Sequence, residues 1–101
     1  MVLHKVARKS DIQENSGKEV KIDNTRIAIF CTNGKYYALD ALCRHQDGSL
    51  APGQVDGEIV ECPLHSWHYN VRTGELLDYV KGVKLATYEV IIKGNDLYLD
   101  M

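Results

Sequence analysis

The sequence predicts an all-β fold, an antiparallel sandwich of small sheets with a subdomain of loops inserted into it. Apolar residues recur in short alternating or β-branched segments, and turn signals separate them about every eight to twelve residues. Residues 41–82 differ, because they hold both prolines and five of the eight glycines. Short, evenly spaced strands are typical of sandwiches and small barrels, whereas a stretch rich in turn residues forms loops. We expect one domain over residues 1–101, with the loop subdomain at about residues 41–70.

The N-terminal part is expected to form two strands joined by a short connection. Residues 2–6 alternate weakly, and residues 18–23 alternate clearly between polar and apolar side chains. Between them, Ser10 and Gln13 have the spacing of a capping box. The residues that follow include Asn, Ser and Gly, so we expect at most one helical turn there.

The next segment carries the strongest local turn signal of the chain. Residues 26–32 and 36–39 are expected as strands, and Asn33-Gly34 lies between them. Both central residues of a type I′ hairpin turn need positive φ, which Asn and Gly adopt most readily. Residues 24–25 are expected to form the preceding turn. Cys31 shares one face of its strand with apolar neighbours, so we expect it in the core.

The remaining strands follow after the first loop-rich stretch. The expected strands are residues 57–61, 67–71, 88–92 and 96–99. Turn signals lie at residues 72–75, before the last two strands, and at residues 93–95, between them. This pattern predicts a C-terminal hairpin that completes the antiparallel sheets.

Composition and charge exclude several classes of protein. The chain has 12 Lys and Arg against 14 Asp and Glu, a net charge of −2, and no basic cluster with interleaved aromatic residues, so we expect no nucleic-acid partner. The longest apolar run, Ile27–Cys31, is far shorter than the roughly 20 residues that span a bilayer. The first ten residues are too polar for a signal peptide. We therefore expect a soluble, cytoplasmic protein with no membrane partner.

Two pairs of Cys and His stand out in the loop-rich region. Cys43-x-His45 is followed, after sixteen residues, by Cys62-x-x-His65. Turn residues flank the pairs, and two compact pairs on two loops can converge on one metal centre. The four side chains suit structural zinc, which is tetrahedral. However, each loop supplies one Cys and one His, and this mixed pairing favours a two-iron centre in which one iron takes both Cys and the other both His.

The surroundings of these residues resemble the Rieske family of [2Fe–2S] proteins, whose centres have two His and two Cys ligands. The resemblance rests on the runs CRH at residues 43–45 and CPLHSWHY at residues 62–69. It extends over about residues 18–100 in order. Further matching positions are Leu50, Gly53, the approach strand YALD at residues 37–40 and the turn TGEL at residues 73–76.

The resemblance implies one [2Fe–2S] cluster per chain, with Cys43 and Cys62 on one iron and His45 and His65 on the other. Two thiolates leave the oxidised cluster neutral, whereas four give it two negative charges, so the neutral cluster accepts an electron more easily. Rieske potentials accordingly span about −150 to +300 mV, above those of plant-type ferredoxins. Tyr69 matches a family tyrosine that donates to a ligand sulfur, although a plain core tyrosine is the alternative reading.

Other positions depart from the high-potential members of the family. Gly48 and Leu64 stand where those members have a pair of disulfide-bonded cysteines. Trp67 replaces a serine that donates a hydrogen bond to a cluster sulfide, and its only donor is an indole N–H. It resembles the oxygenase-type pattern instead. We therefore expect a midpoint potential in the lower half of the Rieske range, roughly −150 to +100 mV at neutral pH.

The resemblance implies a soluble one-electron carrier of the Rieske ferredoxin type. It implies a flavin reductase upstream and an oxygenase or other terminal acceptor downstream. The chain has no room for a flavin or a catalytic mononuclear-iron domain, so we expect it not to be an enzyme. Two alternatives stay open, the small subunit of a larger reductase complex of the nitrite-reductase kind and a zinc-stabilised binding module.

The third histidine of this region, His68, lies three residues after His65 on an expected strand. Its neighbours on that strand are Trp67 and Tyr69. We expect a solvated or hydrogen-bonded surface side chain there rather than a third histidine ligand.

Overall fold

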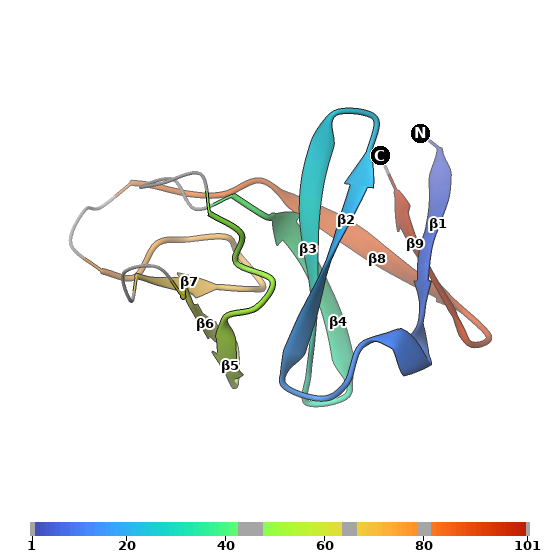
Figure 1. Cartoon of the computed structure of the whole chain (residues 1–101), viewed down its shortest axis with the longest axis horizontal. Helices are drawn as coiled ribbons and strands as arrows, with labels where there is room; N and C mark the ends of the chain where they lie inside the picture. Colours follow the sequence, from blue (N-terminus) through green and yellow to red (C-terminus); the bar gives the residue numbers. More distant parts are fainter. Residues whose placement is uncertain (1, 43–47, 64–66, 79–81, 101) are drawn as a thin grey trace.

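The computed structural model describes residues 2–42, 48–63, 67–78 and 82–100, and within them it is built almost entirely of antiparallel strands (Figure 1). The elements in chain order are β1 (Leu3–Arg8), the 3₁₀ turn η1 (Lys9–Asp11), β2 (Ser16–Ile22), β3 (Thr25–Thr32), β4 (Lys35–Asp40), β5 (Gln54–Asp56), β6 (Ile59–Glu61), β7 (His68–Asn70), β8 (Thr87–Lys93) and β9 (Asp96–Asp100). The predicted all-β fold is confirmed. No helix in the described ranges is long and apolar enough to cross a membrane.

Six strands form one sheet in the order β1-β9-β8-β4-β3-β2. The two halves of this sheet meet where Ala38 and Leu39 of β4 pair with Tyr88 and Thr87 of β8. A core cluster with members on β1 and β9 as well as on β3 and β4 shows that the halves fold over onto each other. The expected small sheets are thus present as the two halves of one continuous sheet.

The central strand β3 is buried on both faces. Ile27, Ile29 and Cys31 belong to the cluster between the halves of the large sheet. Ala28 and Phe30, which alternate with them, belong to a second cluster on the opposite face. A strand covered on both sides needs a continuous apolar run, and this explains the uninterrupted sequence from residue 27 to residue 31. The core position predicted for Cys31 is confirmed, since it is only 5% exposed.

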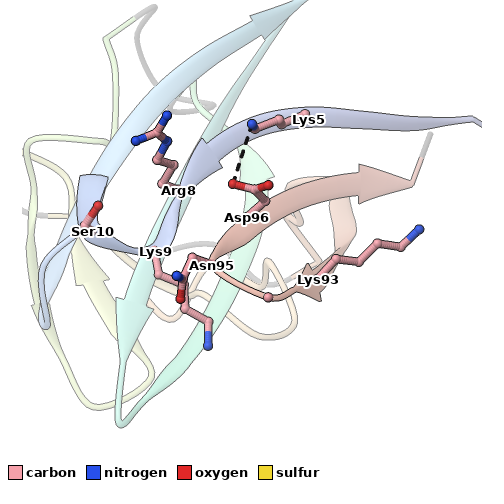
Figure 2. A pocket seen from close by; sticks show the side chains of 8 residues that line it. Lys5, Arg8, Lys9, Ser10, Lys93, Asn95 and Asp96 are labelled. Atoms are coloured by element: carbon pink, nitrogen blue, oxygen red, sulfur yellow. Dashed lines mark ion pairs between the residues drawn. The ribbon is translucent and has the colours of Figure 1, made fainter.

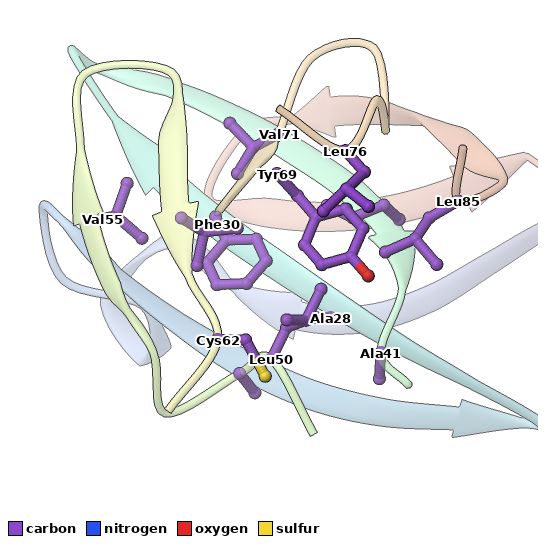
Figure 3. Close-up of a cluster of buried hydrophobic side chains, with 13 residues drawn as sticks. Ala28, Phe30, Ala41, Leu50, Val55, Cys62, Tyr69, Val71, Leu76 and Leu85 are labelled. Atoms are coloured by element: carbon purple, nitrogen blue, oxygen red, sulfur yellow. The ribbon is translucent and has the colours of Figure 1, made fainter. Parts of the chain in front are cut away.

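The second sheet has three strands in the order β5-β6-β7 and lies beside the large one (Figure 1). Its inward side chains, Val55, Val60 and Tyr69, pack with Phe30 of β3 in the second cluster (Figure 3). Thr32 fixes this arrangement, because its buried hydroxyl donates to the Gly57 carbonyl at 2.6 Å in the β5–β6 turn. The large sheet therefore supports the small sheet that carries the loop-rich region.

Local turn chemistry agrees with the sequence in one place and differs in two. The β3–β4 hairpin turns at Asn33 and Gly34, both with positive φ, as predicted. The preceding turn lies one residue earlier than expected, because Thr25 already pairs with Ile22. Asp23 takes the positive φ there.

The predicted helical turn exists, but its cap differs from the expected one. It is a single 3₁₀ turn whose N-cap is Arg8 rather than Ser10. The Arg8 N–H donates to the Asp11 carboxylate at 2.9 Å. The carboxylate at the third position therefore does the capping, and the Ser10–Gln13 box was a wrong interpretation.

Candidate metal centre

The structure describes one of the four predicted ligands. Cys62 directly follows β6 and is fully buried. Cys43, His45 and His65 lie outside the described residues, whereas Trp67 and Tyr69 lie within them. Among the residues that are described, no group of three or more His, Cys, Asp or Glu side chains is placed to hold a metal. What the structure defines is the base of each loop, that is, the residues at which the loop begins and ends.

The base of the first loop is anchored on the large sheet. The Leu50 N–H donates to the Ala41 carbonyl at 2.7 Å, and Leu42 and Ser49 form an antiparallel bridge just beyond them. The Ala41 N–H in turn donates to the Arg26 carbonyl of β3 at 2.9 Å. Backbone hydrogen bonds therefore fix both the start and the end of the first loop at one end of the large sheet.

A half-buried side-chain pair lies directly before this anchored loop base. The Tyr88 hydroxyl of β8 donates to the Asp40 carboxylate of β4 at 2.7 Å. Burial and the neighbouring carboxylate raise the pKa of Tyr88 to about 12. Tyr88 therefore stays protonated at neutral pH and keeps its bond to β4.

The second loop connects β6 to β7. Glu61 pairs with His68 as the last residues of the hairpin ladder. One step further, the Cys62 N–H donates to the Trp67 carbonyl at 2.7 Å, which closes the base of the loop. The hydrogen bonds of the β6–β7 hairpin therefore fix the backbone of Cys62, from which its side chain extends.

Gly53 brings the two loop bases into contact. A methyl carbon at this position would overlap the carbonyl oxygen of Glu61 and would lie 3.0 Å from the carbonyl oxygen of Leu50. Only a residue without a side chain lets the exit of the first loop approach the entry of the second so closely. The bases of both loops therefore lie side by side, as two loops that share one metal centre require.

A cluster of buried apolar side chains, here called the apolar floor, lies beneath these bases. Cys62, Leu50, Ala41 and Tyr69 belong to the same buried cluster (Figure 3). Trp67 packs against this cluster. The Tyr69 ring crosses the cluster with its hydroxyl on the side of Ala41 (Figure 3). Low solvent access around a sulfur ligand is one of the factors that tune a metal centre. A buried thiol at the meeting point of two such loops fits a [2Fe–2S] cluster with Cys and His ligands.

His68 is a hydrogen-bonded side chain of the hairpin, as the sequence predicted. Its Nδ1 lies 2.5 Å from the Asp78 carboxylate, and its Nε2 lies 3.2 Å from the Glu61 carboxylate. Asp78 also accepts the His68 backbone N–H at 2.7 Å. The role of Asp78 was missed, because it comes from the chain after β7 and no local pattern links it to His68. These contacts hold the segment after β7 against His68, close to the point where the second loop ends.

Asp78→Asn is expected to destabilise the protein more at pH 6 than at pH 9. The hydrogen bond that the His68 ring donates to Asp78, with a further contribution from Glu61, raises the pKa of His68. The stabilisation is complete below the unfolded pKa of about 6.5 and is lost as the pH rises through the raised folded pKa. Urea denaturation of wild type and variant at both pH values measures the difference. Asp56→Asn, on the same sheet face, is the control, and a pH-independent effect of Asp78→Asn would contradict the charged pair.

The paired loop bases, the buried Cys62 and the glycine contact agree with a sequence profile of the Rieske [2Fe–2S] domain that matches residues 2–89. The chain belongs to the Rieske [2Fe–2S] family. Its cofactor is therefore one [2Fe–2S] cluster, and the zinc alternative is excluded. The Rieske interpretation of the sequence is confirmed.

Relatives of known role are similar over nearly the whole chain. A 3-phenylpropionate/cinnamic acid dioxygenase ferredoxin subunit from Shigella flexneri is 34% identical over 94 residues, which cover 91% of this chain and 87% of the relative. The same protein from Escherichia coli K12 has the same identity and coverage. This Rieske chain is therefore similar to complete ferredoxin subunits rather than to a fragment of them.

Solved structures agree with this similarity. A carbazole 1,9a-dioxygenase structure, a complex of reduced oxygenase and oxidised ferredoxin, contains a chain that matches with a TM-score of 0.87 and 31% identity, covering 96% of this chain and 91% of that one. The structure of a putative nitrite reductase small subunit matches with a TM-score of 0.87 over all of both chains, but at 21% identity. The second match shows the shared Rieske fold alone.

Proposed function

We propose that this protein carries single electrons from a flavin reductase to a terminal oxygenase. The observation that carries the proposal is the 34% identity to a dioxygenase ferredoxin subunit over 91% of the chain. The similarity to a structure that contains a ferredoxin with its oxygenase supports it. A [2Fe–2S] cluster exchanges one electron at a time, which suits a carrier between a two-electron flavin and a one-electron acceptor.

The proposed ligands are Cys43 and Cys62 on one iron and His45 and His65 on the other. The described geometry supports this assignment at Cys62, whose thiol is buried and whose backbone closes the second loop. We further propose that Tyr69 donates to a ligand sulfur and that Trp67 shields the cluster. Both side chains belong to or pack against the apolar floor.

We propose that residues 1–101 act as a single Rieske domain whose cluster-binding subdomain spans about residues 41–70. The second core cluster supports this, because it joins residues of the large sheet to residues of both loop bases. No catalytic activity of the chain itself is proposed. A cytoplasmic location is proposed as well, and the free thiol of Cys31 is compatible with a reducing compartment.

A second candidate function is the small subunit of a nitrite-reductase-like complex. The observation in its favour is the structural match over the full length of both chains. Its low identity limits that match to the fold, whereas the ferredoxin match includes sequence. The two candidates differ in whether the isolated chain shuttles electrons.

Stopped-flow reduction of the purified holoprotein separates them. The protein is mixed with a candidate NADH-dependent flavin reductase and then with an oxygenase, and the cluster absorbance is followed. A carrier is expected to be reduced and reoxidised as a free chain in repeated turnovers. A chain that reacts only after assembly with a larger reductase would support the second candidate and overturn the first.

Trp67→Ser is expected to raise the midpoint potential. The serine hydroxyl adds a hydrogen-bond donor where high-potential members of the family have one. A bond that strengthens by about 1 kcal/mol on reduction corresponds to roughly 40 mV for a one-electron couple. Protein-film voltammetry measures the shift, with Trp67→Phe as the control that keeps an aromatic ring and adds no donor. An equal shift in both variants would mean that loss of the indole, not the new donor, sets the potential.

A further inference from the structure

A basic hollow lies at the end of the large sheet formed by β1, η1 and the β8–β9 turn (Figure 2). Its volume is about 700 Å³. The cationic side chains that line it are Lys5, Arg8, Lys9 and Lys93. No part of the proposed cluster site contributes to it. The hollow therefore needs an explanation of its own.

A bulge in β1 places two of these cations on the same face. The pairing of β1 with β9 shifts between Lys5 and Ala7, which leaves Val6 as an extra residue. Val6 and Ala7 both pack against the core cluster. Because two successive side chains face inward, Lys5 and Arg8 both lie on the outer face, where strict alternation would separate them.

The turn between β8 and β9 completes the hollow. The Lys9 N–H donates to the Asn95 carbonyl at 2.8 Å, which fixes η1 against this turn. Lys93 and Asp96 are backbone partners in the β8–β9 ladder, directly beside this turn. The backbone that presents the cations is therefore held by hydrogen bonds, although their side chains reach into solvent.

The charge of the hollow is only partly neutralised. Its one lining carboxylate, Asp96, pairs with Lys5 at 3.5 Å. Four cations and one carboxylate leave three positive charges on the lining of a chain whose net charge is −2. Within the described ranges, no ion pair is formed by Arg8, Lys9 or Lys93.

Half of the described cations outside the hollow are neutralised by ion pairs. Lys18, Arg26 and Arg72 each have a carboxylate partner within 4.0 Å, whereas Lys21, Lys35 and Lys84 have none in the described ranges and do not line the hollow. Lys93 lies over the Tyr98 ring, 5.5 Å from its centre, and keeps its charge there. Positive charges without a carboxylate partner on one hollow raise the local potential and attract a negatively charged surface. The charge points to an anionic occupant.

The hollow lies far from the cluster site. In Figure 1 the β8–β9 turn and η1 lie at one end of the long axis, and the small sheet with both loop bases lies towards the other. The molecule measures 39 Å along this axis. A partner seated in the hollow therefore leaves the loop bases exposed.

The arrangement of the cations favours a protein surface over a small anion. Arg8, Lys9 and Lys93 extend in different directions from the hollow instead of converging on one point (Figure 2). The Lys9 N–H, which a small anion would use, is occupied by the Asn95 carbonyl. Only an extended anionic surface contacts all of these side chains at once.

We propose that the basic hollow docks an acidic patch of a partner protein while the cluster end remains free to exchange electrons. The docking of the acidic patch does not depend on the proposed function. Only the statement that the cluster end exchanges electrons meanwhile rests on that function. The partner is defined by its chemistry, a surface with several Asp and Glu side chains.

The test compares two charge-matched variants of the holoprotein. Arg8→Glu with Lys93→Glu reverses two charges of the hollow, and Lys21→Glu with Lys35→Glu reverses two exposed lysines on β2 and β4 outside it. Both variants have the same net charge. The probe is a fluorescein-labelled decaglutamate peptide, followed by fluorescence anisotropy at low and at physiological ionic strength.

We expect the hollow variant to bind the peptide at least about tenfold more weakly than the control variant, with salt reducing the difference. Amide chemical-shift changes on adding the peptide should centre on β1, η1 and the β8–β9 turn. Equal affinity of the two variants would overturn the proposal. So would binding of inorganic phosphate or of phosphatidylserine vesicles in preference to the peptide, or concentration-dependent self-association lost only in the hollow variant.

Cluster absorbance and reduction by dithionite serve as checks on both variants. Both are expected to be unchanged, because the hollow lies outside the cluster site. If electron transfer to an oxygenase fails in the wild type while the affinity difference persists, the proposed function is wrong and the docking site stands. If the affinity difference is absent while electron transfer proceeds, the docking site is wrong and the function stands.

Discussion

Replacement of Cys43 and Cys62 together by serine is expected to abolish the native [2Fe–2S] cluster. A serine hydroxyl is not deprotonated at neutral pH and does not replace a thiolate as an iron ligand. Cys62 is fully buried, and serine has nearly the same shape, so loss of the ligand is a larger effect than loss of packing. Visible absorption, iron and acid-labile sulfide content measure the result. An intact [2Fe–2S] centre in the double variant would show that the ligand assignment is wrong.

Cys31→Ser is the matched control for this experiment. Cys31 is also a buried thiol, but it lies in the core between the halves of the large sheet, with its sulfur 3.8 Å from the Glu14 carboxylate. Burial raises the pKa of Cys31, which keeps the thiol neutral. This variant is expected to lose about 1 kcal/mol of stability at most and to keep its full cluster content. Loss of the cluster in this variant would mean that replacing a core thiol is enough to disturb the site, even when that thiol is not a proposed ligand.

The features that the sequence predicted correctly depend on neighbours in the chain. The Asn33-Gly34 turn forms as predicted because its φ values are properties of two adjacent residues. The double-sided burial of β3 follows from a run of consecutive apolar residues.

The features that were missed depend on residues far apart in the sequence. Strand β5 has only three residues and exists because Val55 packs beneath the large sheet and pairs with Val60. Glu14 accepts the N–H groups of Asn33 at 2.6 Å and Gly34 at 3.2 Å, a bond across the sheet that no local pattern announces. Long-range contacts of this kind also join the halves of the large sheet.

Gly53 shows how local and distant information combine. The sequence marked it as a position where Rieske loops have glycine, but only the structure shows the reason. Its α-carbon lies against the Glu61 carbonyl at the entry of the second loop. The requirement comes from the partner backbone, because Gly53 does not have a positive φ in the structure.

Gly53→Ala is expected to destabilise the protein by about 1–3 kcal/mol and to lower its cluster content. The new methyl group would overlap the Glu61 carbonyl oxygen and crowd that of Leu50 at 3.0 Å, and backbone atoms of a paired strand cannot turn aside as a side chain would. The two loop bases must then separate. Urea denaturation and the ratio of iron to protein measure the two effects in the same preparation.

Gly57→Ala is the control that separates this collision from ordinary glycine strain. Gly57 has a φ of +61° and nothing within 4 Å of an added methyl carbon, so alanine meets only the cost of a left-handed backbone, roughly 1 kcal/mol. Its turn connects β5 to β6, away from both loop bases, and the cluster content is expected to stay full. The decisive comparison is therefore iron content rather than stability, because both variants lose stability but only Gly53→Ala forces the loop bases apart. Full cluster occupancy in Gly53→Ala would mean that the loops reach the cluster without the close contact at this glycine.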